Sequence, residues 1–353
     1  MNKKSINVTA KVYDTQAKNF VFPEDNLEEL KGKESLGICF SGGGTRSASL
    51  TLGQLRALDK IGVLERAKYM CGVSGGSWGS LPFIYLDKNI GDSTFLGEYL
   101  APSQITLNNL KQTPKNSMAN AISNSKILKD TIIEALKLRK EGKDDPRDLY
   151  SLIVADIMLK PFNIGEHNKF FTYNEQTRDE ILNQNKGFKK DDFYLVNPNK
   201  NRPYYIAQGI VGNYSHADLL PSKQDEKLAP KTIERHQFEM TPLYVGVNQL
   251  FKPTNITPNA IGGGYVQPHG FNSNSPVKFD SSTKLVQTTL DSKNSIFHLG
   301  EIIGISGAAP AVYSWICDLV NKLFKVQLFP NQKYWCNFSN PTSAVVSRYD
   351  FAD

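Results

Sequence analysis

Two glycine-rich turns, Ser41-Gly42-Gly43-Gly44-Thr45-Arg46 and Gly72-Val73-Ser74-Gly75-Gly76-Ser77-Trp78, decide the fold of this chain. Each turn follows a short apolar run, residues 36–40 in the first case and 69–71 in the second. A strand that breaks into glycines before a helix leaves backbone N–H groups unpaired at the helix start, where they bind anions. A serine between glycines at a second such turn has the geometry of a nucleophile elbow. Together the turns predict an oxyanion hole beside an activated serine, the minimum equipment for acyl transfer.

The segment between the turns has the pattern of a helix. Its apolar residues recur at steps of three and four, as on one helix face: Ala48, Leu52, Leu55 and Leu58. Gly62 is placed to end this helix. The order strand, turn, helix, strand, turn predicts a βαβ unit with parallel strands. Parallel sheets place their sites beyond the carboxyl ends of the strands, so we expect the Gly43 and Gly44 amides to lie beside Ser74.

The glycines fit phosphate-binding loops poorly. A P-loop has a lysine before its serine or threonine, whereas this chain has Arg46 there and a different glycine spacing. The third glycine of the dinucleotide-binding pattern is missing as well.

The paired turns resemble those of the patatin and cytosolic phospholipase A2 hydrolases, which use a Ser–Asp dyad without histidine. Later blocks resemble the cytosolic phospholipase A2 branch: Phe238-Glu239-Met240-Thr241-Pro242 followed by Gly262-Gly263-Gly264-Tyr265-Val266, and Ile305-Ser306-Gly307-Ala308-Ala309-Pro310. The resemblance covers roughly residues 36–86 and 236–353. It implies an α/β fold of three layers, with a mostly parallel central sheet and helices on both faces. It also implies a lipid acyl hydrolase of phospholipase or lysophospholipase type that needs no cofactor.

The resemblance implies Ser74 as the nucleophile and an aspartate near the end of the catalytic core as its base. Residues 344–351 have the pattern of a strand, which delivers Asp353 to the sheet edge, with Asp350 as the second choice. In the family a glycine usually follows this aspartate, and none follows here. We therefore expect a single catalytic domain over residues 1–353, truncated right after the dyad aspartate.

Further roles follow from the chemistry and from the resemblance. The N–H groups of Gly43 and Gly44 would receive the oxyanion. Arg46 would bind the phosphate of a phospholipid, as the family implies. A lone carboxylate is a weak base for serine unless it is desolvated, so we expect an apolar setting for Asp353. No cluster of His, Cys, Asp or Glu in the sequence has metal-ligand spacing.

Two alternatives remain open. Residues 72–76 also satisfy the GxSxG pattern of Ser-His-Asp esterases of the α/β-hydrolase type. That interpretation requires His298 as the base, with Asp280 or Asp291 as its acid. The other alternative is a catalytically inactive lipid-binding protein of the same fold.

Composition favours a cytoplasmic enzyme that acts at a membrane surface. The 353 residues are 40% hydrophobic, enough for a large core, yet they include no secretory signal and no apolar run long enough to span a bilayer. Cys39 and Cys71 are expected in core strands as reduced thiols, while Cys317 and Cys336 could pair. The net charge of +6 favours an anionic membrane surface, and no motif indicates nucleic acid.

The remaining segments are less patterned. Residues 1–35 predict one edge strand around Val8, Ala10 and Val12. Residues 90–235 match no part of the family pattern and are expected to form an insertion or lid. Within them lies an apolar helical face with basic neighbours that could rest on lipid: Ile127, Leu128, Ile132, Ile133, Leu136, Lys126, Lys129, Lys137, Arg139 and Lys140.

Overall fold

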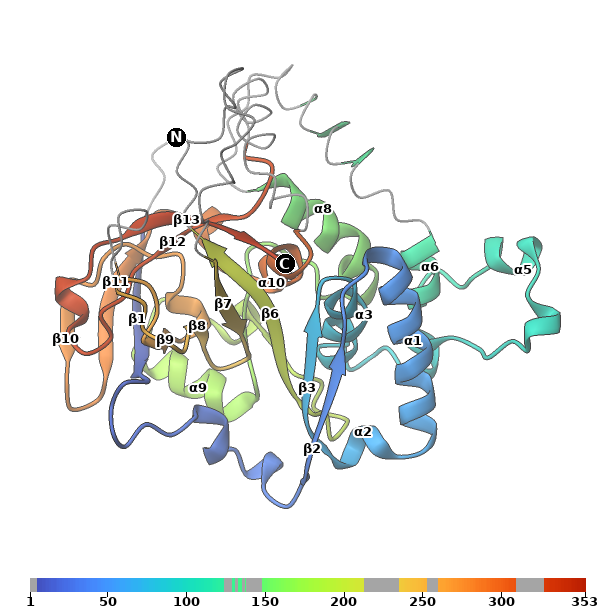
Figure 1. Cartoon of the computed structure of the whole chain (residues 1–353), viewed down its shortest axis with the longest axis horizontal. Helices are drawn as coiled ribbons and strands as arrows, with labels where there is room; N and C mark the ends of the chain where they lie inside the picture. Colours follow the sequence, from blue (N-terminus) through green and yellow to red (C-terminus); the bar gives the residue numbers. More distant parts are fainter. Residues whose placement is uncertain are drawn as a thin grey trace, which may run out of the picture.

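The computed structural model describes residues 5–123, 129–130, 133–134, 137, 148–212, 235–252, 260–308 and 327–353 (Figure 1). An 11-stranded sheet forms the centre, in the order β10-β11-β1-β9-β8-β7-β6-β13-β12, with β3 joined to β6 and β2 joined to β3. The strands of this sheet are β1 Ile6–Asp14, β2 Glu34–Phe40, β3 Ala67–Val73, β6 Tyr204–Gly212, β7 Arg235–Met240, β8 Val245–Val247, β9 Gly264–Val266, β10 Lys278–Asp280, β11 Leu285–Leu290, β12 Asn331–Tyr334 and β13 Ser347–Ala352. A separate pair contains β4 Phe170–Thr172 and β5 Phe193–Leu195.

The predicted βαβ unit is present. Strand β2 leads into α1 (Gly44–Lys60), and β3 leads into α3 (Gly75–Ile84), with β2 and β3 paired in parallel. The apolar stripe of α1 buries Ala48, Leu52 and Leu55. Gly62 follows the end of α1 in the left-handed conformation, at φ 68°. This conformation is favourable for glycine and ends the helix as expected.

The α/β class is confirmed, but the sheet is more antiparallel than the sequence indicated. Parallel pairing joins β2 to β3 and β3 to β6, whereas the other described pairs in this sheet are antiparallel. Parallel neighbours need long crossover connections, and only the first part of the chain supplies an obvious one. Strands β7 and β8 are instead joined by a tight turn at residues 241–244.

Two expectations about the strands are corrected. The strand around Val8, Ala10 and Val12 exists, but β1 lies inside the sheet between β11 and β9 rather than at an edge. Strand β6 falls within the 90–235 stretch that was expected to be an insertion, yet it pairs with β3, β7 and β13. Residues 204–212 therefore belong to the sheet core.

Helices α1, α3, α8 (Leu149–Met158) and α10 (Leu299–Ser306) pack together beside β3 and β6 (Figure 1). Other described helices include α2 Val63–Arg66, α4 Asp92–Leu96, α5 Leu107–Lys111, α6 Met118–Ser123 and α9 Glu175–Gln184. Within the described part of the chain, no helix is both long and apolar enough to cross a membrane. Most of the predicted basic helical face lies outside the described residues: Lys126, Ile127, Leu128, Ile132, Leu136, Arg139 and Lys140. Cys317 lies outside them as well.

The opposite face of the sheet, at β8 and β9, carries an aromatic cluster. Strand alternation places Glu239 and Tyr265 on the face turned away from α10. Phe20 and Phe22 pack against Tyr265 there. The short 3-10 helix at Pro23–Asn26 adds Glu24, which is 3% exposed and accepts a hydrogen bond of 3.1 Å from the Tyr244 hydroxyl.

Glu24 predicts a measurable dependence of stability on pH. Burial raises the pKa of its carboxyl from 4.5 to about 7, so the folded protein holds this proton across a range in which the unfolded chain releases it. The free energy of unfolding should therefore fall as pH rises from about 4.5 to 7. Replacing Glu24→Gln should reduce this slope and stabilise the protein at pH 8 by up to about 3 kcal/mol. Urea unfolding at several pH values measures this free energy, and Glu28→Gln, at an exposed position, is the control. The same pH dependence in Glu24→Gln as in the wild type would contradict the prediction.

Candidate active site

Ser74 occupies the sharp turn between β3 and α3. Its φ of 54° and ψ of −129° lie in a region that residues other than glycine rarely adopt. The side chain is 7% exposed. Strained serines at strand-to-helix turns present their hydroxyl groups as nucleophiles, so the local geometry agrees with the predicted elbow.

The glycines after Ser74 let the two turns pack together. A Cβ on Gly75 would lie 2.0 Å from the carbonyl oxygen of Gly44, and a Cβ on Gly76 would lie 2.4 Å from that of Phe40. No side chain fits at either distance. The elbow is therefore in direct backbone contact with the first glycine turn.

The first turn adopts conformations that favour glycine. Gly43 and Gly44 have φ values of 140° and 60°, and Gly44 is the first residue of α1. The first N–H groups of a helix have no partner within it, which leaves them available to an anion. Gly42 had no predicted role, yet a Cβ there would lie 3.0 Å from Ser74 Cβ. The turn is thus held against Ser74, while the donor roles of Gly43 and Gly44 remain predictions.

Asp353 reaches Ser74 because two strands end at the same level beside β6. Strand β3 runs parallel to β6 and pairs Val73 with Gln208, whereas β13 runs antiparallel and pairs Ala352 with Ile210. Strand β7 occupies the other edge of β6, so β3 and β13 share one edge and meet end to end. Ser74 is the residue after β3 and Asp353 is the residue after β13, and the Ser74 side chain lies close enough to the Asp353 carboxyl to lower its pKa.

The second candidate base lies elsewhere. Asp350 pairs with Gly212, further along β6, and accepts a hydrogen bond of 2.7 Å from Asn331 Nδ2. The structure therefore brings Asp353, not Asp350, to the serine.

Gly209 lies on β6 between the two strand ends, and no sequence pattern pointed to it. A Cβ at this position would lie 2.8 Å from Ile305 Cγ2 and 3.1 Å from the carbonyl oxygen of Ala352. Any larger residue would press on both α10 and the end of β13. The absence of a side chain at Gly209 thus keeps the meeting point of Ser74 and Asp353 closely packed.

The carboxyl end of α10 fixes the elbow from the other side. The Ser74 backbone N–H donates to Ser306 Oγ at 3.1 Å, and Ser306 Oγ is 2.7 Å from Ser77 Oγ. Trp78 Nε1 donates to the carbonyl oxygen of Ile303 at 3.3 Å. Ser306 belongs to the 305–310 block that resembled the family, which was the available signal for this contact; Ala309 and Pro310 lie outside the described residues.

Asp353 has the desolvated setting expected of a carboxylate base. Burial raises the pKa of its carboxyl, and this effect exceeds the opposite effect of the nearby Ser74 side chain. Tyr150 lies close enough for the Asp353 charge to raise the pKa of its phenol, although burial is the larger cause. The Tyr150 hydroxyl donates to the carbonyl oxygen of Gly307 at the end of α10.

Arg46 lies in the first turn of α1, two residues after Gly44, and is exposed. Its side chain has no hydrogen bond or ion pair to any of the described residues. An arginine in this position is open to a bound anion, and its role toward phosphate remains a prediction.

The structure does not assemble the alternative triad. His298 precedes the first residue of α10, whereas Ser306, which contacts Ser74, is its last. Eight helical residues separate these ends by about 12 Å. His298 Nε2 instead lies 3.5 Å from Glu301 Oε1.

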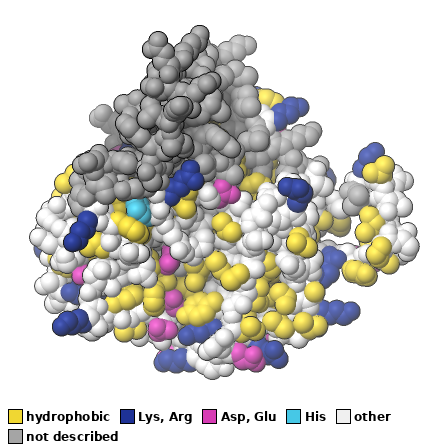
Figure 2. Space-filling model, viewed as in Figure 1, with side chains coloured by type: hydrophobic (Ala, Val, Ile, Leu, Met, Phe, Trp, Pro, Cys, Tyr) yellow, Lys and Arg dark blue, Asp and Glu magenta, His cyan; other side chains and the backbone are white. Residues whose placement is uncertain are grey.

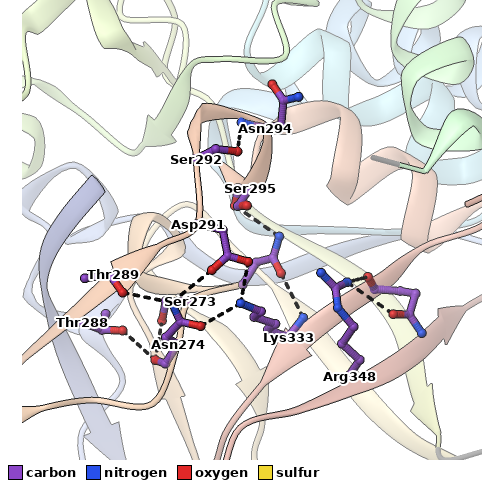
Figure 3. A network of polar contacts seen from close by, with 12 residues as sticks. Ser273, Asn274, Thr288, Thr289, Asp291, Ser292, Asn294, Ser295, Lys333 and Arg348 are labelled. Atoms are coloured by element: carbon purple, nitrogen blue, oxygen red, sulfur yellow. Dashed lines mark hydrogen bonds and ion pairs between the residues drawn. The ribbon is translucent and has the colours of Figure 1, made fainter. Parts of the chain in front are cut away.

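The proposed acids of that triad are engaged elsewhere. Asp291 forms an ion pair of 2.6 Å with Lys333, inside the polar network of Figure 3. Asp280 accepts a hydrogen bond of 2.6 Å from Ser282 Oγ. Among the described residues, no group of three or more His, Cys, Asp or Glu side chains is placed to hold a metal ion.

Comparison with known families agrees with the motifs. Residues 36–133 match the family model of the lysophospholipase catalytic domain, a stretch that includes both glycine turns. This match confirms the resemblance that the turns predicted. No curated protein matches the chain.

Two solved structures of human GIVD cytosolic phospholipase A2 are similar in part. One is 18% identical, with a TM-score of 0.31, over 74% of this chain and 26% of that chain. The other, in complex with methyl gamma-linolenyl fluorophosphonate inhibitor and terbium chloride, is 18% identical, with a TM-score of 0.29, over 80% of this chain and 31% of that chain. This chain therefore spans less than a third of the length of either protein.

Proposed function

We propose that this chain is a lipid acyl hydrolase that cleaves fatty-acyl esters of phospholipids or lysophospholipids through a Ser74–Asp353 dyad. The observation that carries the proposal is the strained Ser74 beside a half-buried Asp353, whose pKa the Ser74 side chain influences, where β3 and β13 meet. The match of residues 36–133 to the lysophospholipase catalytic domain supports the substrate class.

The proposed reaction follows from the positions of these groups. Ser74 Oγ attacks the ester carbonyl carbon while the Asp353 carboxylate takes the hydroxyl proton and passes it to the leaving alcohol. Water then hydrolyses the acyl-serine, with Asp353 again accepting a proton. The Gly43 and Gly44 N–H groups stabilise the oxyanion in both steps, each worth roughly 3–4 kcal/mol in comparable sites.

The dyad predicts a specific pattern of activity losses. Ser74→Ala and Asp353→Asn should each lower hydrolysis of a chromogenic fatty-acyl ester by several powers of ten with the fold retained, because each removes a group that acts on the reacting atoms. Asp350→Asn is the matched control on the same strand and should keep activity. Because burial raises the Asp353 pKa and the base must be ionised, the acid limb of kcat/KM should lie above the ~3.9 of an ordinary aspartate.

Circular dichroism of each variant and labelling by a fluorophosphonate complete this test. Wild-type labelling should map to Ser74. Full activity of folded Ser74→Ala would exclude the serine mechanism, and loss of activity in Asp350→Asn but not in Asp353→Asn would reassign the base.

We propose that Arg46 binds the substrate phosphate. Arg46→Gln should lower turnover of a phospholipid at least tenfold while changing turnover of a neutral short-chain ester little, since only the phospholipid offers a phosphate to the guanidinium. Parallel assays on both substrates measure this difference. Equal losses would mean that Arg46 supports the glycine turn instead.

We further propose that the enzyme works at an anionic membrane surface, using the arm around α5. This arm projects from the body beyond α6 (Figure 1) and carries exposed apolar and basic side chains (Figure 2): Tyr99, Ile105, Leu107, Lys111 and Lys115. Apolar side chains that enter the headgroup region beside lysines bind anionic lipid. The net charge of +6 acts in the same direction.

A matched pair of variants tests the arm. Leu107 and Val277 are both 78% exposed, but only Leu107 lies on the arm. Leu107→Asp should weaken sedimentation with phosphatidylserine-containing vesicles, whereas Val277→Asp should not. Binding should also fall with salt, because surface attraction is screened beyond about 8 Å at physiological ionic strength. Equal binding by the two variants would exclude this arm as the contact.

A further inference from the structure

Cys39 and Cys71 are direct cross-strand neighbours. They are register partners on the parallel strands β2 and β3. As register partners on parallel strands they point to the same face of the sheet, and the Cys39 thiol is close enough to contribute to the raised pKa of the Cys71 thiol. Neighbouring strands are about 4.8 Å apart, which falls within the Cα separation of about 4.4–6.8 Å that disulfides span. Both thiols are free in the structure.

The pair is accessible, contrary to the expectation that both residues lie in the core. Cys39 is exposed and Cys71 is half-buried. Among the described strands β2 pairs only with β3, so Cys39 lies on an edge strand of the sheet. An exposed thiol beside a second thiol is a recognised setting for reversible oxidation.

We propose that Cys39 and Cys71 are a thiol modification site, which a peroxide converts into an intramolecular disulfide that a dithiol reductant reopens. This inference goes beyond the hydrolysis proposed above. Its effect on activity rests on that proposed function, whereas the formation of the bond does not.

The chemistry balances with a peroxide as oxidant. The Cys39 thiolate attacks one peroxide oxygen, the O–O bond breaks, and Cys39 becomes a sulfenic acid while water leaves after protonation. The Cys71 sulfur then attacks the sulfenic sulfur, the S–S bond forms, and the sulfenic oxygen departs as a second water with the Cys71 proton. Two thiols lose two electrons, and hydrogen peroxide becomes two waters. Cys39 reacts first because it is exposed, whereas burial raises the pKa of the Cys71 thiol to about 11.

The disulfide would act directly on the candidate site. Cys39 lies three residues before Gly42, and Cys71 lies three residues before Ser74. A disulfide draws its two Cβ atoms to about 3.8 Å and so fixes the spacing of β2 and β3. The turns that follow these strands are closely packed against each other, since a Cβ on Gly42 would lie 3.0 Å from Ser74 Cβ. A small movement of β2 therefore displaces the proposed oxyanion turn relative to Ser74.

Peptide mapping tests the bond itself. The protein is treated with hydrogen peroxide, remaining thiols are alkylated, and trypsin releases Cys39 in residues 34–46 and Cys71 in residues 69–88. We expect a cross-linked pair of these peptides that dithiothreitol separates. Cross-linking of Cys39 to Cys336 or Cys317, or a Cys39 that proceeds to sulfinic acid while Cys71 stays reduced, would overturn the proposal.

Activity and variants test the consequence. Oxidation should lower ester hydrolysis and fluorophosphonate labelling of Ser74 by about tenfold or more, as expected when catalytic groups are displaced, and dithiothreitol should restore both. Cys39→Ser and Cys71→Ser should resist oxidation, whereas Cys336→Ser should respond like wild type. A cross-linked protein with unchanged hydrolysis overturns the coupling to the site. If the reduced protein hydrolyses no ester, the proposed function fails, and the cross-linked peptides still decide the disulfide.

Discussion

The candidate site depends on two strands that end against each other along one edge of β6. Strand β3 arrives in parallel and β13 arrives antiparallel, and their registers stop at Gln208 and Ile210. The residues that follow these strands, Ser74 and Asp353, are therefore positioned next to each other by the backbone hydrogen bonds of the sheet rather than by flexible loops. Groups held on paired strands are positioned more accurately than groups on loops, as an acid–base pair requires.

This meeting point demands small residues around it. Gly209 lies on β6 between the two strand ends, a Cβ on Gly75 would overlap the Gly44 carbonyl, and a Cβ on Gly42 would press on Ser74. A side chain at these positions would separate the groups that the proposed reaction brings together. The left-handed φ of Ser74 belongs to the same constraint, because the chain must turn sharply from β3 into α3. The hydrogen bond from Ser74 N–H to Ser306 and the packing of α10 stabilise that strained turn.

The parts of the site that could be predicted from the sequence are those that depend on residues close together in the chain. The apolar runs, the glycines and the helical stripe between them lie within about 45 residues and predict the βαβ unit correctly. Asp353 was reached through the family resemblance; the structure places it next to Ser74 at the end of β13, and its role as the base stays a prediction. Gly209 was missed because its importance depends on two partner strands that are far away in the sequence. One ends at Val73 and the other at Ala352, so no local pattern around Gly209 indicates that they meet there.

Other errors have similar physical causes. The direction of a strand depends on long-range pairing, so the antiparallel majority of the sheet could not be seen from short apolar runs. Strand β6 lies between polar stretches that resemble surface loops, which concealed a central strand. Cys39 has the local sequence of a core residue, but it is exposed on an edge strand, and which strand lies at an edge is a property of the whole sheet.

The setting of Asp353 bears on how a serine could be activated without histidine. A carboxylate in water is too weakly basic to take a proton from a hydroxyl group efficiently, because solvation stabilises its charge. Burial removes part of that solvation and raises the pKa of Asp353, while the nearby Ser74 side chain acts in the opposite direction with a smaller effect. His298, the only alternative base that the sequence offered, lies at the far end of α10. Within the described residues, the desolvated carboxylate is thus the group that combines contact with Ser74 and raised basicity, and the fold supplies both through the same strand end.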